Sequence, residues 1–244
     1  MIRLILIAIF VILYHILGLP VLGILWIWGK FNKPASDLAS LRIVQWAFRV
    51  ILFLAGTEIT VIGEEHVPKD QAVLYIANHQ SYFDIVLTYA RCPNLTGFVA
   101  KDSIQKIPIL PIWMRRLYCL FLNRDDIREG MKTILAGIDQ LKRGISVFIF
   151  PEGTRNDHPE ELLPFKEGSF KLALKSGCPI IPIAITNSCQ IYERQAPFVK
   201  KTHVVIQYGA PINPADLDGE NKKHIGEHSR ELIAKMLEDN QNYL

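Results

Sequence analysis

The chain has 244 residues, half of them hydrophobic, which is enough for one ordinary domain with an appendage. Its net charge of +3 is too small for a nucleic-acid-binding protein, and its four cysteines form neither a C-x-x-C pair nor the dense set of a disulfide scaffold. Residues 1–60 carry five basic and two acidic side chains. This excess of three positive charges equals the net charge of the whole chain and favours contact with an anionic membrane surface.

The N-terminal part, residues 1–56, is predicted to be a membrane-associating segment of two helices. Residues 4–28 contain no Asp, Glu, Lys or Arg and are long enough to cross a hydrocarbon core of about 30 Å. Gly18, Pro20 and Gly23 interrupt this run, which suggests a kinked span or a re-entrant segment.

The second predicted helix, residues 36–55, is apolar except for one polar stripe. Arg42, Gln45 and Arg49 form this stripe. Such a helix fits the membrane interface or burial against the first helix, and the alternative is a core helix of a soluble protein. Residues 30–49 carry four basic side chains against a single one before the first helix, so the following domain is expected on the cytoplasmic side.

From about residue 57 the pattern changes to alternating strands and helices. This predicts one α/β domain, residues 57–244, with a mostly parallel or mixed central sheet of about seven strands flanked by helices. The strand-like runs are 58–62, 72–77, 96–100, 118–122, 145–150, 180–186 and 203–208. Helical patterns lie at 126–143, 167–176 and 221–239. The predicted apolar face of the first of these helices consists of Ile127, Met131, Ile134, Leu135, Ile138 and Leu141.

A histidine and an aspartate follow the second strand-like run. Ser81 and Asp84 form a helix-start signal, which places His79 at the end of the strand and Asp84 in the first helical turn. In open α/β sheets, ligands bind at this edge. The carboxylate can accept a hydrogen bond from the N–H of one ring nitrogen and leave the other nitrogen free as a general base. The alternative is that Asp84 only caps the helix and His79 is a polar loop residue.

The strand-like run 145–150 is followed by four residues suited to an anion. Gly153 permits close backbone approach, Thr154 supplies a hydroxyl, and Arg155 offers a planar fork for phosphate oxygens. Glu152 could hydrogen-bond an alcohol or hold an arginine. The alternative is an ordinary turn after a strand.

Two further strand-like runs end in a basic residue, Lys101 in one case and Arg124 in the other. Any one of these basic side chains alone would indicate only a solvent-exposed residue at the end of a strand. A His, Lys or Arg lies at or after the end of each of four predicted strands, and together these residues predict a cationic pocket beside the base formed by His79 and Asp84. Such a pocket suits a substrate that carries a phosphate and a hydroxyl to be deprotonated.

The segment from His224 to His228 matches the H-x-x-E-H pattern of inverted zinc peptidases. A zinc site of this kind needs a third protein ligand, and only sixteen residues follow His228. The segment is therefore predicted to be an exposed helix face, and no metal site is expected.

Four segments of the chain, in this order, resemble the glycerolipid acyltransferases, and most of all the bacterial 1-acylglycerol-3-phosphate acyltransferases. They are N-H-x4-D at 78–84, F-x-x-R at 121–124, F-P-E-G-T-R at 150–155 and P-I-I-P at 179–182. The resemblance covers roughly residues 64–212. It departs at Tyr118, where the second segment of the family usually opens with glycine.

The resemblance implies a glycerol-3-phosphate acyltransferase-like fold. It also implies transfer of an acyl group from acyl carrier protein or coenzyme A to the free hydroxyl of 1-acylglycerol-3-phosphate, which forms phosphatidic acid in phospholipid biosynthesis. By resemblance, His79 with Asp84 activates the hydroxyl. Arg124 and residues 152–155 bind the glycerol phosphate with Lys101 nearby, and residues 179–182 help to shape the acyl side.

The expected partners are the lysophosphatidic acid, the acyl donor and a phospholipid membrane, with no nucleic acid. The acyl thioester is a substrate, so no cofactor is expected. The expected location is the cytoplasmic face of a bacterial inner membrane. The alternatives are an acyltransferase for another lysophospholipid or alcohol, a thioester hydrolase, and a non-catalytic membrane lipid-binding protein.

Overall fold

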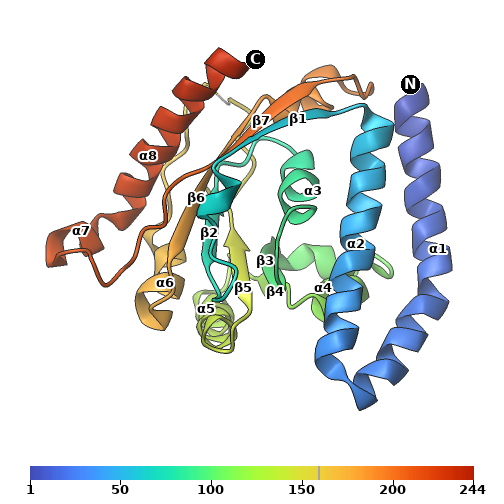
Figure 1. The fold of residues 1–244 in the computed structure, drawn as a ribbon, viewed down its shortest axis with the longest axis horizontal. Coiled ribbons are helices and arrows are strands. Elements are labelled where there is room, and N and C mark those ends of the chain that lie inside the picture. The colour runs from blue at the N-terminus through green and yellow to red at the C-terminus, as the bar shows by residue number, and fades with distance from the viewer. Residues whose placement is uncertain (159) are drawn as a thin grey trace.

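One mixed sheet of seven strands forms the centre of the protein in a computed structural model that describes residues 1–158 and 160–244 (Figure 1). The order across the sheet is β1-β7-β6-β2-β5-β3-β4. Strands β2 to β6 run parallel to one another, and β7 pairs antiparallel with β6 and parallel with β1. The strands are β1 (Glu58–Ile62), β2 (Leu74–Ala77), β3 (Thr96–Lys101), β4 (Leu120–Leu122), β5 (Ser146–Ile149), β6 (Ile180–Thr186) and β7 (His203–Tyr208). The predicted α/β sheet is confirmed.

Helices cover both faces of the sheet because its central strands are apolar on both sides. In β2, Leu74 and Ile76 pack in the core beneath α5, α6 and α8, whereas Tyr75 and Ala77 pack on the opposite face beneath α2, α3 and α4 (Figure 1). The helices are α1 (Ile2–Phe31), α2 (Lys33–Ala55), α3 (Phe83–Tyr89), α4 (Leu110–Arg116), α5 (Ile127–Lys142), α6 (Lys171–Ser176), α7 (Gly219–Lys223) and α8 (Ile225–Asp239).

Helix α5 begins at its predicted cap, where the Asp126 carboxylate accepts two amide N–H groups of the first turn at 2.8 and 3.1 Å. Its predicted apolar face is only partly correct. Ile134, Ile138 and Leu141 pack in the core. The exposed members are Ile127 (85%), Met131 (58%) and Leu135 (58%). The apolar arc of α5 is wider than the part that the sheet and α6 cover.

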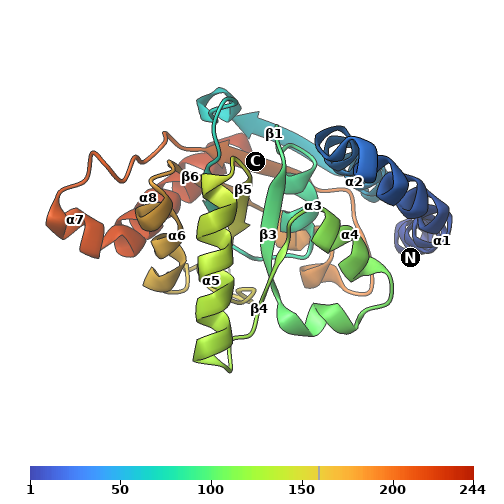
Figure 2. The same cartoon turned by 90° about the horizontal axis from the view of Figure 1, so that it is seen from below.

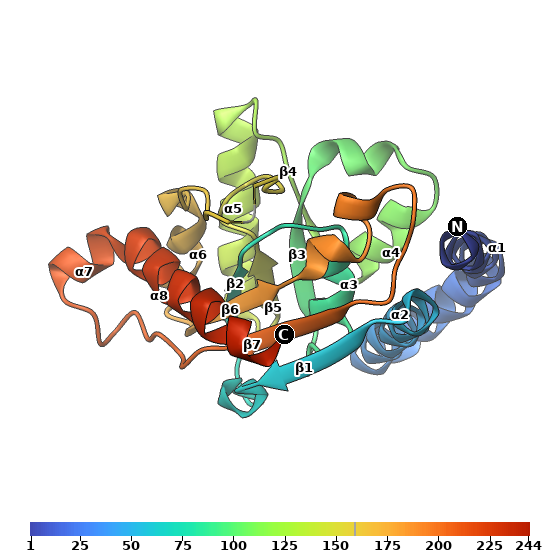
Figure 3. The same cartoon turned by 90° about the horizontal axis from the view of Figure 1, so that it is seen from above.

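Helices α1 and α2 form a hairpin along one side of the molecule, with α1 outermost (Figures 1 and 3). Helix α1 is assigned as one helix that includes Pro20, and its C-terminal part bends toward the start of α2 in Figure 1, as expected for a kinked span. Most large apolar side chains of α1 are exposed, and both helices are long and apolar enough to cross a membrane. This exposed apolar surface favours membrane association of the hairpin.

The polar stripe of α2 faces the α/β domain. The Gln45 amide donates to the carbonyl oxygens of Tyr89 and Cys92 at 3.1 and 2.7 Å, and the Arg49 guanidinium donates to that of Ala90 at 3.3 Å. These carbonyls lie at the C-terminal end of α3, where a helix leaves carbonyl groups without intrahelical partners. The stripe therefore docks the hairpin onto α3 and does not form its lipid-facing side.

Tyr118 provides a second attachment of the hairpin. Its φ of 61° lies in the left-handed region, which explains why glycine suits this position. The Tyr118 hydroxyl donates to the Asp37 carboxylate of α2 and accepts a hydrogen bond from the Lys33 ammonium at 2.7 Å. Tyr118 is therefore engaged with the start of α2.

Candidate active site

His79 lies directly after β2 and is oriented by Asp84 in the first turn of α3. A carboxylate can only accept, so the 2.8 Å contact between Asp84 Oδ2 and His79 Nδ1 is a hydrogen bond donated by the imidazole. The same oxygen accepts the amide N–H groups of Gln80 and Ser81, each at 2.7 Å. Asp84 is fully buried. It therefore both organises the start of the helix and fixes the tautomer that leaves Nε2 of His79 free.

The other oxygen of Asp84 accepts the hydroxyl of Ser188, which follows β6, at 2.5 Å. Asn78 ties the same loop to β6, because its side chain donates to the Ile185 carbonyl at 2.9 Å and accepts the Ile185 amide at 2.8 Å. Each of these partners lies more than a hundred residues away along the chain. No local signal in the sequence identifies Ser188, and it was not among the predicted site residues.

The end of β5 forms a platform and a clamp for His79. The imidazole stacks on the Phe150 ring with centroids 4.0 Å apart and 14° between the ring planes. The Glu152 carboxylate accepts the His79 amide N–H at 2.7 Å and that of Leu163 at 3.1 Å, and the Asn156 amide donates to the His79 carbonyl at 2.7 Å. Burial raises the pKa of the Glu152 carboxyl above its usual value, although the two amide donors oppose this shift. Glu152 thus holds the backbone of the histidine.

Beyond Glu152 the loop requires glycine. Gly153 has a φ of +78°, and a Cβ there would lie 2.7 Å from the Lys166 ammonium nitrogen. Lys166 therefore lies directly over this turn. None of the described residues forms an ion pair with Lys166. It was not predicted as a site residue, since a single lysine in a loop carries no pattern of its own.

Arg155 is held at the edge of the site by two side chains. Its guanidinium lies 3.8 Å from the centroid of the Tyr82 ring and 3.5 Å from the Glu193 carboxylate. Glu193 also accepts the Ser81 hydroxyl at 2.7 Å and the Tyr82 amide N–H at 2.8 Å. One glutamate, which the sequence did not indicate, thus joins the histidine loop to the predicted phosphate-binding arginine.

The predicted site residues meet at a single cavity of about 930 Å³ at the carboxyl ends of β2 to β5. Six of the eight line this cavity: His79, Lys101, Arg124, Gly153, Thr154 and Arg155. The other two, Asp84 and Glu152, are buried behind it. Lys166 and Lys171 also line the cavity, and the only carboxylate among its described lining residues is Asp126, which caps α5. The predicted cationic pocket beside a histidine is therefore present in the structure.

The cavity continues from this cationic end into an apolar region. Phe10 and Tyr14 of α1 and Phe48 of α2 line it together with Trp113 of α4 and Phe98 of β3. A molecule with an anionic head and a hydrocarbon chain matches this division. Residues 180–182 lie in buried strand β6, directly after Pro179, and none of residues 179–182 is among the described residues that line the cavity.

The H-x-x-E-H segment lies at the start of α8. His224 is the residue before this helix, and Glu227 forms an ion pair with Arg230 at 3.1 Å. Within residues 1–158 and 160–244, no group of three or more His, Cys, Asp and Glu side chains is placed to hold a metal ion.

Comparisons with known proteins agree with this geometry. Residues 58–186 match the family model described as Acyltransferase. Two proteins named 1-acyl-sn-glycerol-3-phosphate acyltransferase are each 32% identical to the chain. The match to the one from Borreliella burgdorferi covers 82% of this chain and 79% of that protein. The match to the one from Haemophilus influenzae covers 75% of each. A crystal structure titled as the 1-acyl-sn-glycerophosphate (LPA) acyltransferase PlsC from Thermotoga maritima shares the fold, with a TM-score of 0.83, 22% identity and coverage of 98% of this chain and 95% of that one. The chain therefore belongs to the acyltransferase family.

Proposed function

We propose that the protein transfers an acyl group from a thioester to the free hydroxyl of 1-acylglycerol-3-phosphate, forming phosphatidic acid for phospholipid biosynthesis. The observation that carries this proposal is that a histidine oriented by a buried carboxylate lines the same cavity as five Lys and Arg side chains. The names of the relatives, which include the Borreliella burgdorferi and Haemophilus influenzae proteins, support the same acceptor.

In the proposed reaction, Nε2 of His79 takes the proton of the glycerol hydroxyl while the hydroxyl oxygen attacks the thioester carbonyl carbon. The tetrahedral adduct then collapses, the carbon–sulfur bond breaks, and the thiolate takes the proton back from the imidazolium. Asp84 stabilises the positive charge on His79 in between. A positioned base of this kind contributes about 10²–10⁴-fold, and alignment of the two substrates supplies much of the remaining rate enhancement.

The phosphate of the acceptor is proposed to bind the cations at the strand ends. Arg124 and Arg155 supply planar forks, and Lys101 and Lys166 supply point charges. Gly153 and Thr154 form the adjacent turn. Glu152 was expected to contact substrate, but both of its oxygens accept backbone N–H groups, so we assign it to the positioning of His79.

The apolar region of the cavity is proposed to hold an acyl chain. Helices α1 and α2 line this region, so the segment 1–56 contributes a wall of the cavity to the domain 57–244 in addition to its proposed membrane attachment. Both chains of the product belong in a bilayer, which supports association with a phospholipid membrane. The excess of basic residues after α1 supports placement of the domain at the cytoplasmic face.

The donor is proposed to be a thioester of acyl carrier protein or coenzyme A. Each step above uses only side chains of this protein and its two substrates, so the proposal includes no cofactor and no metal. The four thiols are buried or half-buried, and burial raises the pKa of the Cys119 thiol to about 11, which makes this cavity-lining thiol a poor nucleophile.

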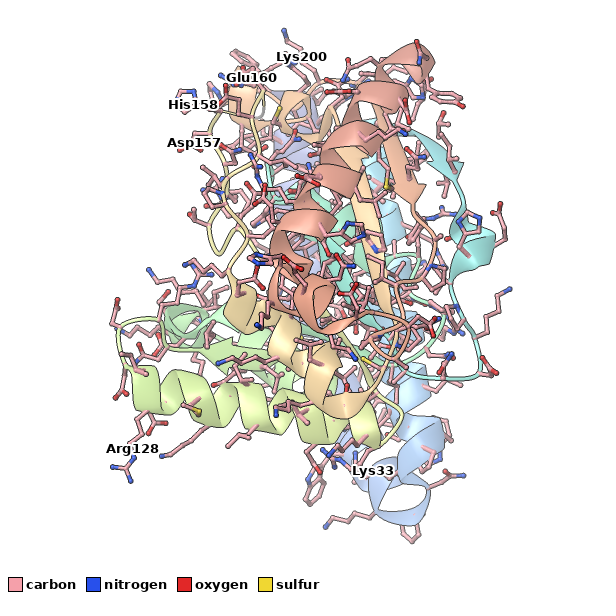
Figure 4. All side chains as sticks on the ribbon, turned by 90° about the vertical axis from the view of Figure 1, so that its left-hand side faces the viewer. Lys33, Arg128, Asp157, His158, Glu160 and Lys200 are labelled. Carbon is pink, nitrogen blue, oxygen red and sulfur yellow. The ribbon has the colours of Figure 1, made fainter. Side chains whose placement is uncertain are left out.

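The test is an assay of thioester consumption with and without lysophosphatidate, with product analysis by mass spectrometry. His79→Ala should abolish the formation of phosphatidic acid while the melting temperature stays near that of wild type. His158→Ala is a matched control, because His158 projects from the outer surface of the protein (Figure 4). Release of free fatty acid without any acceptor would instead indicate a hydrolase, and binding of lysophosphatidate without turnover would indicate a lipid-binding protein.

A further inference from the structure

The α/β domain exposes a group of large aliphatic side chains beside the cavity. Ile127 is 85% exposed and Met131 58% exposed, and both project from the first two turns of α5. Ile107 and Ile112, between β3 and the middle of α4, are 48% and 50% exposed. We call these four residues the apolar ridge. Exposed aliphatic side chains that border a cavity favour a partner, because their hydration is unfavourable.

The ridge extends from α5 toward the hairpin. In Figures 2 and 3, which view the molecule from below and from above, the green segment between β3 and α4 lies between the N-terminal end of α5 and helix α1. Helix α1 exposes its own aliphatic side chains along its length, including Ile5 at 51% and Ile12 at 59%. Exposed aliphatic side chains therefore occur both on α1 and on the ridge.

The charge around the ridge suits an anionic surface. Residues 101–135 carry seven Lys and Arg against four Asp and Glu, and residues 1–60 carry an excess of three. The rest of the chain is net negative. Lys106 is exposed beside Ile107, and Arg128 projects outward from α5 (Figure 4). Juxtaposed aliphatic and basic side chains are typical of surfaces that bind anionic lipid.

The ridge also borders the mouth of the active site. Ile127 and Met131 of α5 line the cavity, as do Phe10 and Tyr14 of α1, so both helices contribute a wall. A lipid that enters between these two walls passes from one exposed apolar surface to a cationic interior. Both walls must therefore touch the bilayer if the acceptor is to move into the cavity without crossing water.

On the basis of the proposed function, we propose that the apolar ridge docks on the surface of an anionic phospholipid bilayer. It forms a second membrane contact of the α/β domain, separate in sequence from α1 and α2. The two contacts together hold the mouth of the cavity against the lipid headgroups. The hairpin alone would leave the tilt of the whole molecule on the bilayer to a single apolar surface.

The direct test uses an environment-sensitive fluorophore on the full-length protein. Ile127→Cys, Ile5→Cys and Tyr243→Cys are each labelled with NBD, which is feasible because the four native thiols are buried or half-buried. Tyr243 is 52% exposed near the C-terminus and is the matched control. In vesicles of phosphatidylglycerol and phosphatidylcholine, the probes at residues 127 and 5 should shift to the blue and be quenched by brominated acyl chains. A silent probe at 127 beside a responsive one at 5 overturns the proposal.

The functional test uses Ile107→Ser/Ile112→Ser, because these two residues do not line the cavity. With lysophosphatidate in vesicles, kcat/KM should fall on the order of tenfold, since two aliphatic side chains no longer enter the interface. With a short-chain, water-soluble lysophosphatidate it should remain unchanged, which also shows that the proposed activity is intact. A loss confined to acyl carrier protein as donor would identify the ridge as a protein-docking surface and overturn the proposal. Tyr243→Ser is the control and should behave as wild type in every arm.

Discussion

Asp84→Asn separates the charge of the carboxylate from its role in orienting His79. Three N–H groups, from His79, Gln80 and Ser81, converge on Oδ2 within 2.8 Å. The amide oxygen of asparagine must take that position, because an NH₂ group there would face three donors. The NH₂ group then faces Ser188, whose hydroxyl can accept as well as donate. The substitution therefore preserves the tautomer and orientation of the imidazole and removes the negative charge.

The magnitude follows from the distance between the charges. The 2.8 Å hydrogen bond places the centre of the imidazolium about 4 Å from that of the carboxylate, and this pair is worth about 4 kcal/mol at an effective dielectric constant of 20. The charge on His79 develops only as it takes the proton. Its loss therefore raises the barrier and should reduce kcat by about 10³-fold. The KM for the acceptor should stay near the wild-type value because the phosphate contacts are unchanged.

The assay is steady-state kinetics of Asp84→Asn and Asp84→Ala with thermal melting of each. The alanine variant leaves the amide groups of Gln80 and Ser81 without their acceptor in the interior, at a cost of about 1–3 kcal/mol each, so it should also melt at a lower temperature. Asp157→Asn, on the outer surface in Figure 4, is the control. A kcat within twofold of wild type for Asp84→Asn would refute the electrostatic role. A melting temperature as low as that of the alanine variant would refute the preserved orientation.

The KM for lysophosphatidate should rise by about 10–100-fold in each of the variants Arg124→Ala, Arg155→Ala and Lys166→Ala, because each loses a charge-assisted hydrogen bond to phosphate. The kcat at saturation should change less. A KM equal to that of wild type contradicts the phosphate site. Burial raises the pKa of the Glu152 carboxyl in the folded protein. The difference in melting temperature between wild type and Glu152→Gln should therefore favour wild type most below the ordinary glutamate pKa, and this advantage should fall as pH rises through the raised pKa. A difference that does not depend on pH would show that the pKa of this carboxyl is not perturbed. Tyr118→Phe should lower the free energy of unfolding by about 1.5–3 kcal/mol, because the hydrogen bonds of the hydroxyl to α2 are lost; chemical denaturation in detergent measures this change. The kcat/KM for a water-soluble acceptor should stay unchanged, and a fall in kcat/KM would place Tyr118 in the acceptor site.

The sheet could be predicted because its buried strands are short, continuous apolar runs bounded by polar residues. Parallel strands bring their carboxyl ends to one edge, so residues that directly follow such runs must lie together. This rule identified His79, Lys101, Arg124 and Arg155 before any coordinates. The geometry of the edge therefore followed from the pattern of strands, although the depth of the cavity and its apolar extension did not.

The residues that the sequence did not reveal act across long separations. Glu193 reaches Ser81 from 112 positions away, and Ser188 reaches Asp84 from 104. Ser188 comes soon after β6, but Glu and Ser are common in loops and neither residue belongs to a recognisable motif. The periodicity of the sequence also could not show that only half of the predicted apolar face of α5 packs in the core. The pattern gives the apolar arc of the helix, but it does not give the width of the protein surface that covers this arc.

Tyr118 shows how a departure from a family pattern can leave the chemistry unchanged. The position requires a left-handed backbone, which costs a non-glycine residue about 1–2 kcal/mol. The tyrosine offsets this cost through its hydroxyl, which bonds Asp37 and Lys33 at the start of α2. Its side chain lies outside the described lining of the cavity, so the substitution does not alter the acceptor site. It strengthens the joint between the hairpin and β4 instead, and that joint fixes how the apolar wall from α1 and α2 stands over the cationic edge of the sheet.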